Sequence, residues 1–334
     1  MKAAVLHGRE DVRVEDLAES APGPGEVRVR VEAALTCGTD LKVFKRGYHA
    51  RMITPPAVFG HEFAGVITAV GEGAAAGAVG DRVVAANSAP CGGCFFCRRH
   101  QENLCEDLLF LNGAYAESIC VPARIVARNL LFLRPSTSFQ TAALSEPLAC
   151  VVQGIEDCAL QTGERVLVIG SGPIGLMFVA LARHAGCVVS VAGRGQERLA
   201  AAQRLGATSV ADGAGAISGG AFDVVIEAVG KVETWEAAVR LVRKGGRVNF
   251  FGGCPSGTAI SLDTGVIHYS NLILRASFHH TPRTFRRALQ LLEDGIIRAE
   301  DFVDGRCALS GLPGLFQSMA TGNRAVKTLI DPRG

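Results

Sequence analysis

The chain has 334 residues, of which 48% are hydrophobic and 20% charged, and its formal net charge is +2. This length favours two domains over one, and the composition allows each to bury a sizeable core. No basic tract interleaved with aromatic residues points to nucleic acid. No apolar run approaches the roughly 20 residues that span a membrane, and the first residues are not a signal peptide. We therefore predict a soluble cytoplasmic protein that binds neither membranes nor nucleic acids.

The first 145 residues are predicted to be β-rich. Residues 26–32 alternate polar and apolar side chains with period two, as a half-buried strand does. Turn signals are dense, with proline and glycine at 22–25, two prolines at 55–56 and many glycines at 71–80. Short strands separated by such turns indicate a barrel-like or sandwich domain.

Two short motifs in this region carry candidate metal ligands. Cys37-Gly-Thr-Asp40 is followed by Gly60-His-Glu62. Each motif is weak alone, because a single cysteine or histidine is more often packed than bound to a metal. Together they offer a thiolate, an imidazole and a carboxylate, which is the mixture that a catalytic zinc with an open position uses. A further carboxylate, Glu146, lies at the predicted junction of two domains, where we expect a cleft.

Four of the eleven cysteines are clustered, at Cys91, Cys94, Cys97 and Cys105. An odd total without a secretory signal argues against a disulfide framework, so we interpret the cluster as a metal site. Four thiolates with no open position predict a closed structural zinc site in a lobe at 88–107. The alternative is an iron–sulfur cluster, but the bacterial ferredoxin run has a shorter last gap and a proline where Glu106 stands here.

From residue 165 to about 278, short apolar segments alternate with helical patterns. We predict strands at 166–169, 188–191, 224–227, 248–251 and 273–276, and helices at 173–185, 197–205 and 232–242. This alternation implies βαβ units and a parallel sheet. Beyond it, Thr281 and Pro282 predict the start of a helix that ends at Gly295.

A glycine-rich loop, Gly170-Ser-Gly-Pro-Ile-Gly175, follows the first of these strands and opens the next helix. In this context it predicts a dinucleotide site: the first glycine permits a tight turn, Gly172 lets the backbone approach a pyrophosphate, and the third lets helix and strand pack closely. The alternative is a glycine-rich turn of some other α/β protein. The cofactor-binding residues that we assign are Gly170, Gly172, Pro173, Ile174, Gly175, Val229, Phe251, Gly252, Ser277 and Phe278.

The residue that binds the adenosine ribose is expected at the end of the next strand. NAD enzymes usually have Asp or Glu there, whereas this chain has Gly193, followed by Arg194 and, one helical turn on, Arg198. No carboxylate repels a 2′-phosphate, and arginines can bind one bidentately. We therefore predict NADP(H) rather than NAD(H). The alternative is that both arginines are solvated surface residues and NAD still binds.

In combination, these motifs resemble the zinc-containing medium-chain dehydrogenase/reductase family, in the branch of sorbitol, threonine and sugar-alcohol dehydrogenases. The matching segments are 37–40, 60–65, 80–83, the four-cysteine lobe, 146–149, 170–175 and 222–227. The resemblance implies an α/β fold, with a GroES-like β-rich catalytic domain at 1–147 and 279–334. It also implies a Rossmann domain, a doubly wound parallel sheet, at 148–278, and assembly as a homodimer or homotetramer.

The resemblance further implies a catalytic zinc held by Cys37 and His61, with Glu62 and Glu146 as direct or water-mediated ligands. Thr39 maps onto the family's hydroxyl residue and Asp40 onto the aspartate that orients the ligating histidine. Zinc would lower the pKa of a substrate hydroxyl, whose proton Thr39 would take as hydride passes to the nicotinamide. Together with the four-cysteine site, this gives two zinc ions per chain.

The chain departs from the family pattern at Lys42, where many relatives have a histidine that ends the proton relay. Either the relay runs through the cofactor ribose to solvent, or Lys42 is an exposed bystander, which we favour. His49 could face the cleft and bind a polar substrate, or be a surface-loop histidine. His279 and His280 give only a weak indication of a role near the nicotinamide.

The leading hypothesis is an enzyme that interconverts a secondary alcohol or polyol and a ketone with NADP(H). One alternative is an amino-alcohol or cyclitol dehydrogenase of a biosynthetic pathway that uses NAD(H). Another is a non-catalytic NADPH-binding protein stabilised by zinc. The presence of Cys37, His61 and Glu62 together with Thr39 disfavours a protein without activity.

Overall fold

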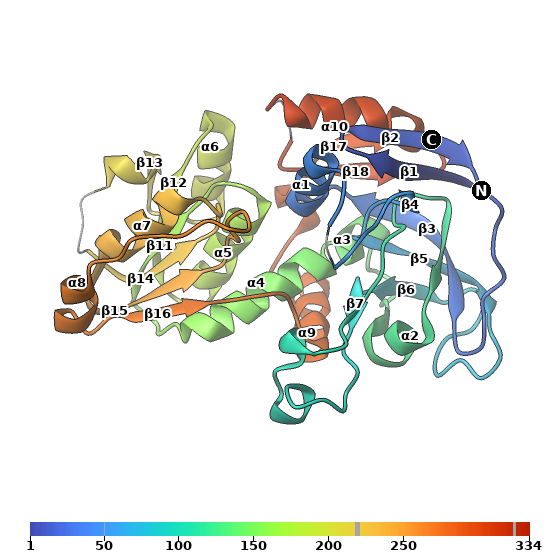
Figure 1. Cartoon of the computed structure of the whole chain (residues 1–334), viewed down its shortest axis with the longest axis horizontal. Coiled ribbons are helices and arrows are strands. Elements are labelled where there is room, and N and C mark those ends of the chain that lie inside the picture. Colours follow the sequence, from blue (N-terminus) through green and yellow to red (C-terminus); the bar gives the residue numbers. More distant parts are fainter. Residues whose placement is uncertain (50, 218–220, 323–324) are drawn as a thin grey trace. The chain divides into compact units, whose positions relative to one another are not determined.

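The computed structural model describes residues 1–49, 51–217, 221–322 and 325–334. The chain forms two compact units (Figure 1). Unit 1 comprises Met1–Ala149 and His280–Gly334, and unit 2 comprises the continuous segment Cys150–His279. Within the described ranges, no helix combines the length and the apolar character needed to cross a membrane.

Unit 1 is built on a seven-stranded sheet with the order β10-β6-β5-β3-β18-β17, and β9 also pairs with β3. Its strands are β3 (Val27–Leu35), β5 (Phe63–Val70), β6 (Arg82–Ala85), β9 (Ser118–Val121), β10 (Leu130–Phe132), β17 (Val303–Ala308) and β18 (Lys327–Asp331). A smaller sheet joins β2 (Asp11–Asp16), β1 (Lys2–Gly8) and β4 (Ala57–Val58), and β7 (Ser88–Ala89) pairs with β8 (Leu109–Phe110). The predicted strand at 26–32 lies in β3, whose inward-facing valines are buried.

Five helices belong wholly to unit 1: α1 (Gly38–Arg46), α2 (Ala123–Asn129), α3 (Phe139–Ala143), α9 (Pro282–Glu293) and α10 (Leu312–Ala320), with 3-10 turns at Ala299–Asp301 and Leu309–Gly311. Helix α9 begins as predicted. Thr281 caps its N-terminus in a reciprocal capping box with Thr284, Pro282 is its first residue, and Gly295 follows its end. Its buried face, which includes Phe285 and Leu289, packs in the core of the unit.

Unit 2 is a six-stranded, fully parallel sheet with the order β13-β12-β11-β14-β15-β16. Its strands are β11 (Arg165–Ile169), β12 (Val188–Gly193), β13 (Ser209–Asp212), β14 (Phe222–Glu227), β15 (Val242–Phe250) and β16 (Ile273–Ala276). The helices are α4 (Ser145–Cys158, which starts in unit 1), α5 (Pro173–His184), α6 (Gln196–Arg204), α7 (Val232–Leu241) and α8 (Thr264–Tyr269), with a 3-10 turn at Ala214–Ala216. This is the doubly wound order, which reverses between β11 and β14, so the predicted α/β fold is confirmed.

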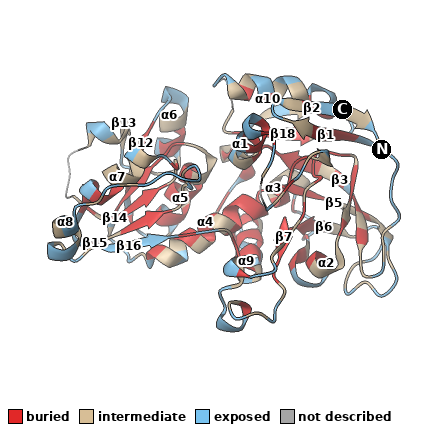
Figure 2. Ribbon diagram, viewed as in Figure 1, coloured by how far each residue is buried: buried red, intermediate tan, exposed pale blue. Residues whose placement is uncertain are grey.

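The structure also corrects several expected bounds. The helix expected at 232–242 ends at Leu241, the strand expected at 248–251 begins at Val242, and β13 and α8 were not predicted. Figure 2 shows buried residues gathered in the central strands of the two large sheets and exposed ones on the outer helices. β13 lies at the edge of its sheet and has no fully buried residue, so it lacks the apolar run that reveals the inner strands.

Candidate active site

Two neighbouring strands of unit 1 bring the predicted metal ligands together. Strands β3 and β5 are antiparallel, with Ala34 opposite Phe63. The residues that follow β3 therefore lie beside those that precede β5. As a result, Cys37, His61 and Glu62 each place a ligand atom within 4.8 Å of the others.

Helix α1 starts at the cysteine of this group. Cys37 is the N-cap residue in an extended conformation, and its Sγ accepts a hydrogen bond from the Thr39 N–H at 3.4 Å. Asp40 lies in the first turn, where the helix N-terminus stabilises a carboxylate. Cys37 and Thr39 are half-buried, whereas Asp40 is buried. The start of this helix thus carries a cysteine sulfur, a hydroxyl and a carboxyl group, of which the first two are partly exposed.

Asp40 fixes the orientation of His61. The Asp40 Oδ1 lies 2.8 Å from the His61 Nδ1, and its Oδ2 accepts a hydrogen bond from the Tyr115 hydroxyl at 2.6 Å. Burial, with Asp40 nearby, raises the pKa of Tyr115 well above its usual value, so the hydroxyl is a proton donor. Because Asp40 occupies Nδ1, Nε2 is the nitrogen left to face a metal. Sequence reasoning missed Tyr115, since its contact with Asp40 depends on the tertiary fold.

Glu62 is paired with a lysine that sequence reasoning also missed. The Lys327 Nζ donates hydrogen bonds to Glu62 Oε1 at 2.8 Å and to the Thr36 carbonyl at 2.9 Å. Burial raises the pKa of Glu62, and Lys327 partly offsets this effect. Lys327 is 2% exposed and Glu62 fully buried, so the carboxylate has its own countercharge. The sequence gives little signal for this pairing, because Lys327 begins a short strand of mixed polar and apolar residues.

Glu146 forms a separate buried pair with His280. The Glu146 Oε1 lies 3.9 Å from the His280 Nε2, which is also 3.0 Å from the Asn87 Oδ1. Burial raises the pKa of Glu146 to about 7, and the charges of His61 and Glu62 also act on it. Burial lowers the pKa of His280 to about 3, so this imidazole is neutral at pH 7. Glu146 is therefore close to the ligand group without belonging to its tightest cluster.

The donor set fits a zinc ion with an open position. A thiolate, an imidazole and a carboxylate are the ligand types of catalytic zinc, and a carboxylate on the remote nitrogen of the histidine is the usual support. All of these groups converge in unit 1, and the half-buried side chains of Cys37 and Thr39 give access from solvent.

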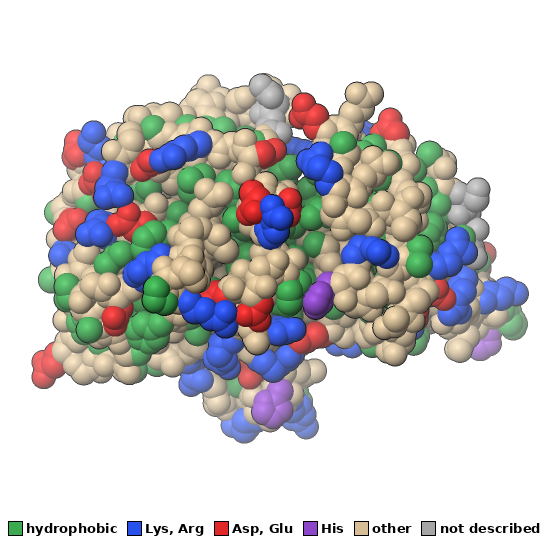
Figure 3. Space-filling view, turned by 180° about the vertical axis from the view of Figure 1, so that it is seen from behind, with side chains coloured by type: hydrophobic (Ala, Val, Ile, Leu, Met, Phe, Trp, Pro, Cys, Tyr) green, Lys and Arg blue, Asp and Glu red, His purple; other side chains and the backbone are tan. Residues whose placement is uncertain are grey.

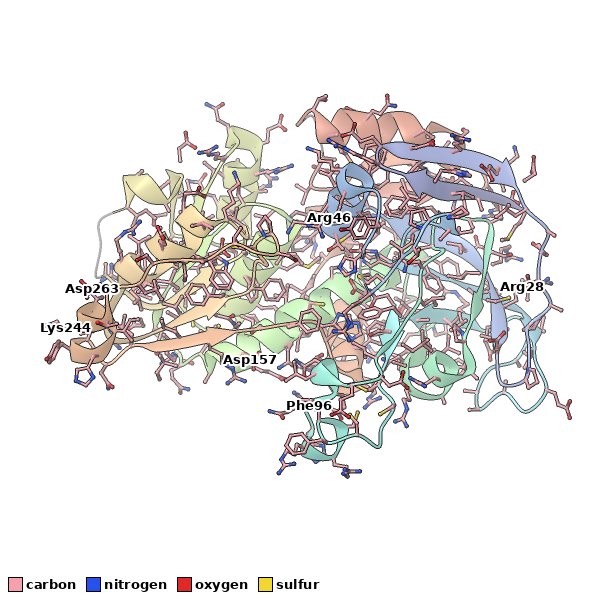
Figure 4. All side chains as sticks on the ribbon, viewed as in Figure 1. Arg28, Arg46, Phe96, Asp157, Lys244 and Asp263 are labelled. Atoms are coloured by element: carbon pink, nitrogen blue, oxygen red, sulfur yellow. The ribbon has the colours of Figure 1, made fainter. Side chains whose placement is uncertain are left out.

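The four clustered cysteines place their sulfur atoms within 4.8 Å of one another, between β7 and β8. Two 3-10 turns, Cys97–Arg99 and Glu102–Leu104, shape this lobe, in which Figure 4 labels Phe96. Hydrogen bonds from the backbone of Cys97 and Glu106 lower the pKa of Cys94 to about 6, which favours a thiolate. Four sulfurs converging in this way suit a closed tetrahedral zinc site.

The surface around the lobe carries charge of both signs. Arg98, Arg99 and His100 are exposed on it. On the face seen in Figure 3, acidic and basic side chains are interspersed. This distribution differs from the continuous basic face of nucleic-acid-binding proteins.

The glycine loop of unit 2 lies at the carboxyl end of β11, where the strand order reverses. Gly172 is the N-cap of α5, Pro173 is its first residue, and Ile174 follows. A Cβ at Gly175 would lie 1.9 Å from the Gly170 carbonyl oxygen, so only glycine allows α5 to pack this closely. Free N–H groups of a helix N-terminus at such a switch point are where dinucleotide phosphates bind.

Gly193 ends β12 against the side chain of Ser171. A Cβ at this position would lie 2.4 Å from the Ser171 side chain. The Ser171 Oγ accepts a hydrogen bond from the Arg194 N–H at 3.1 Å and donates one to the Arg194 carbonyl at 2.9 Å. The loop therefore has no room for Asp or Glu at 193, and it leaves the Arg194 side chain exposed and Arg198 half-buried on α6.

Two of the other residues assigned to the cofactor are linked through Glu227, at the end of β14. The Glu227 carboxylate accepts a hydrogen bond from the Val229 N–H at 2.9 Å, and its carbonyl accepts one from the Gly252 N–H at 2.9 Å. Glu227 is buried, so it holds the two loops that follow β14 and β15 in place. Glu227 ends the 222–227 motif, but its partners lie in loops that only the fold brings beside it.

The other residues assigned to cofactor binding are Phe251, Ser277 and Phe278, and their side chains have different contacts. The Phe251 ring packs edge-on against Phe178, with ring centroids 5.0 Å apart. The Ser277 hydroxyl is 2.9 Å from the Asn249 amide nitrogen and donates to Asp157 at 2.7 Å. These two side chains serve the packing of unit 2 itself, whereas Phe278 is 49% exposed.

Lys42 lies on α1, and His49 lies just after this helix. Lys42 is exposed. The His49 Nδ1 accepts hydrogen bonds from the Arg51 and Met52 N–H groups, each at 3.2 Å, and this nitrogen therefore shapes its own loop. Figure 4 labels Arg46, the last residue of α1, immediately before this loop.

Comparisons with known proteins identify the family of this chain. Residues 23–130 match the alcohol dehydrogenase GroES-like domain, and residues 173–294 match the zinc-binding dehydrogenase domain. The D-altritol 5-dehydrogenase of Agrobacterium fabrum is 36% identical to this chain, over 88% of each. The sorbitol dehydrogenase of Bacillus subtilis is 29% identical, over 99% of this chain and 97% of that protein.

Solved structures of dehydrogenases have the same fold as this chain. A zinc-binding dehydrogenase from Sinorhizobium meliloti 1021, bound to NADP, is 30% identical with a TM-score of 0.89 over 99% of both chains. The alcohol dehydrogenase of Thermus sp. ATN1 is 31% identical with a TM-score of 0.87, again over 99% of both. The fold and enzyme class predicted from the sequence are thus confirmed. The chain belongs to the zinc-containing medium-chain dehydrogenase/reductase family, in its polyol and sugar-alcohol branch, and is a zinc-dependent dehydrogenase that uses a nicotinamide dinucleotide.

Proposed function

We propose that this enzyme transfers hydride between a secondary alcohol or polyol, or the corresponding ketone, and NADP(H). The proposal is carried by the convergence of Cys37, His61 and Glu62 in unit 1, with Thr39 beside them. In it, residues 1–147 and 279–334 form the catalytic domain, and residues 148–278 bind NADP(H).

Each residue of the group has a part in this proposal. Zinc, when bound, supplies a Lewis acid that lowers the pKa of the substrate hydroxyl. Cys37 and His61 hold the metal, and Asp40 keeps the His61 Nε2 free for it. Glu62 lies beside the Lys327 ammonium group, and either Glu62 or Glu146 supplies the carboxylate ligand. Thr39 accepts the proton of the substrate hydroxyl as its own hydroxyl proton passes through the cofactor ribose to solvent.

A second zinc in the four-cysteine lobe completes the proposed metal content of two ions per chain. Cys91, Cys94, Cys97 and Cys105 hold it with no position left for substrate. Its role is to fix a lobe in which Cys97 and Cys105 are the buried ligands and the residues around them are largely exposed.

A substrate panel tests the reaction. We expect oxidation of neutral polyols such as D-altritol and D-sorbitol with NADP+, and little turnover of L-threonine. The amino-alcohol alternative has its own support, because the L-threonine 3-dehydrogenase of Pyrococcus abyssi is 30% identical over 91% of this chain. A preference for L-threonine with NAD+ would establish that alternative. No turnover of any alcohol by protein containing two zinc ions would refute the proposal.

Replacing Arg194 by alanine is expected to weaken NADPH binding about tenfold and to leave NADH binding unchanged. Loss of a charge-assisted contact to the 2′-phosphate costs of this order. The measurement is the Kd of each cofactor by fluorescence titration. Arg204→Ala is the matched control, because it removes the same charge at the far end of α6, where the side chain is exposed. Equal affinities of the unmodified enzyme for NADPH and NADH would contradict the NADP(H) assignment.

A further inference from the structure

Tyr115 lies behind the proposed metal site and contacts the segments that carry its ligands. Its hydroxyl is 2.6 Å from the Asp40 Oδ2 and 3.1 Å from the Leu35 carbonyl oxygen, at the end of β3. Its ring lies against Gly60, immediately before His61, where a Cβ would be only 2.7 Å from the ring. One side chain therefore touches both α1 and the turn that presents the histidine.

The backbone around Tyr115 strengthens this connection. The Tyr115 N–H donates to the Phe59 carbonyl at 2.9 Å. The Gly60 carbonyl accepts hydrogen bonds from the N–H groups of Gly113 at 2.8 Å and Ala114 at 3.1 Å. Residues 113–115 thus hold the turn at 59–60 in place, directly before His61.

The ring of Tyr115 is fixed by its aromatic neighbours. It packs edge-on against Phe59, with ring centroids 5.6 Å apart, and tilted against Phe316 at 6.0 Å. Tyr115 is fully buried beside these rings, so its hydroxyl is not exposed to bulk water. The position of the hydroxyl oxygen is therefore set by the core of unit 1.

The contact matters because Asp40 is 2% exposed. One oxygen of the carboxylate faces His61 and the other accepts the hydrogen bond from Tyr115. Without that bond, a buried carboxylate oxygen loses its partner, which is costly in a site that excludes water. The carboxylate is then free to rotate, and its hold on the His61 ring weakens.

We propose that Tyr115 is a positioning residue for the catalytic zinc, whose hydroxyl keeps Asp40, and through it His61, in the orientation that binds the metal. Tyr115 touches neither substrate nor cofactor in this proposal, and it acts only through Asp40. The inference rests on the proposed function, since it takes Cys37 and His61 as the zinc ligands.

The substitution Tyr115→Phe removes one oxygen atom and keeps the ring. The measurement is the rate at which zinc passes from the intact enzyme to an excess of a chromogenic chelator. Zinc release from the unmodified enzyme is expected to have two phases, one from each site. The phase that is missing in Cys37→Ser belongs to the catalytic site. In Tyr115→Phe that phase should be about tenfold faster, as for other residues that support a metal ligand. The phase from the four-cysteine lobe should not change.

Tyr269→Phe is the matched control, because it makes the same chemical change on a residue that is 83% exposed on α8. Unchanged release of the catalytic zinc from Tyr115→Phe would overturn the inference. Equal acceleration of both phases would also overturn the inference, because it would show that the substitution destabilises the whole of unit 1. If the unmodified enzyme releases only the zinc of the four-cysteine lobe, the proposed function fails instead.

A second measurement does not depend on the folding of the variant. The chain has three tyrosines, and 3-fluorotyrosine can replace all of them. The 19F resonance of Tyr115 should shift when the catalytic zinc is removed, whereas that of Tyr269 should not. A Tyr115 resonance that stays in place on zinc removal would contradict the coupling through Asp40 and His61.

Discussion

Replacing Cys37 by serine or His61 by alanine is expected to abolish turnover while NADPH still binds. Without either ligand the metal is lost or misplaced, and the several kcal/mol of charge stabilisation that it supplies correspond to about a thousandfold or more in kcat. Cofactor binding should persist, because the glycine loop belongs to unit 2. Turnover, NADPH titration and zinc analysis check the three parts of this prediction. Zinc content should fall from two ions to about one per chain, with the remaining ion in the four-cysteine lobe.

Cys120→Ser is the matched control for this prediction. Cys120 lies on β9 of the same unit, half-buried, with its Sγ 3.5 Å from the Ser20 carbonyl. The variant should keep its activity and both zinc ions. Normal turnover of either Cys37→Ser or His61→Ala would refute the assignment of the catalytic metal.

Replacing Lys327 by methionine is expected to lower the free energy of unfolding by about 3–5 kcal/mol, the usual cost of breaking a buried ion pair on one side. The change leaves the Glu62 carboxylate buried without its countercharge, since Lys327 donates to it at 2.8 Å. The double variant Lys327→Met/Glu62→Gln should recover much of this loss, because it removes both charges together. Urea denaturation of protein with known zinc content measures both effects.

Lys45→Met is the control for the loss of a lysine in the same unit. Lys45 is exposed on α1 and donates to the Ala320 carbonyl at 2.9 Å, so its replacement should change stability by less than about 0.5 kcal/mol. If Lys327→Met is as mild as this control, or if the double variant is no more stable than the single one, Lys327 does not stabilise Glu62.

The parts of the fold that could be predicted are those with strong local patterns. The apolar strand before the glycine loop and the helix after it identified β11 and α5, and the alternation beyond them predicted the parallel sheet. Strand β18 could not be found in this way, because it begins with the buried polar residues Lys327 and Thr328. Lysine is almost never fully buried unless it is paired, and its partner is far away in the sequence.

In the candidate site, too, residues in short motifs could be predicted and distant contacts could not. Cys37, His61 and Glu62 could be proposed because each stands in a short motif whose residue types suit zinc. The pairing of β3 with β5 then brings them together. Tyr115 meets Asp40 across 75 residues of chain, and Lys327 meets Glu62 across 265. Contacts over such separations are fixed by the packing of the whole unit. A single sequence therefore reveals the metal-binding groups more readily than the residues that orient them or balance their charge.

The position of β18 between β3 and β17 affects when the large sheet of unit 1 can be completed during synthesis on the ribosome. Domains fold as they emerge, N-terminal parts first. The four-cysteine lobe is complete once Cys105 has been made, 14 residues after Cys91. The buried ion pair of Glu62 and Lys327 can form only after the whole of unit 2 has been synthesised. All four cysteines of the lobe are therefore present early in synthesis, whereas the sheet next to Cys37, His61 and Glu62 is completed only when β18 has been inserted.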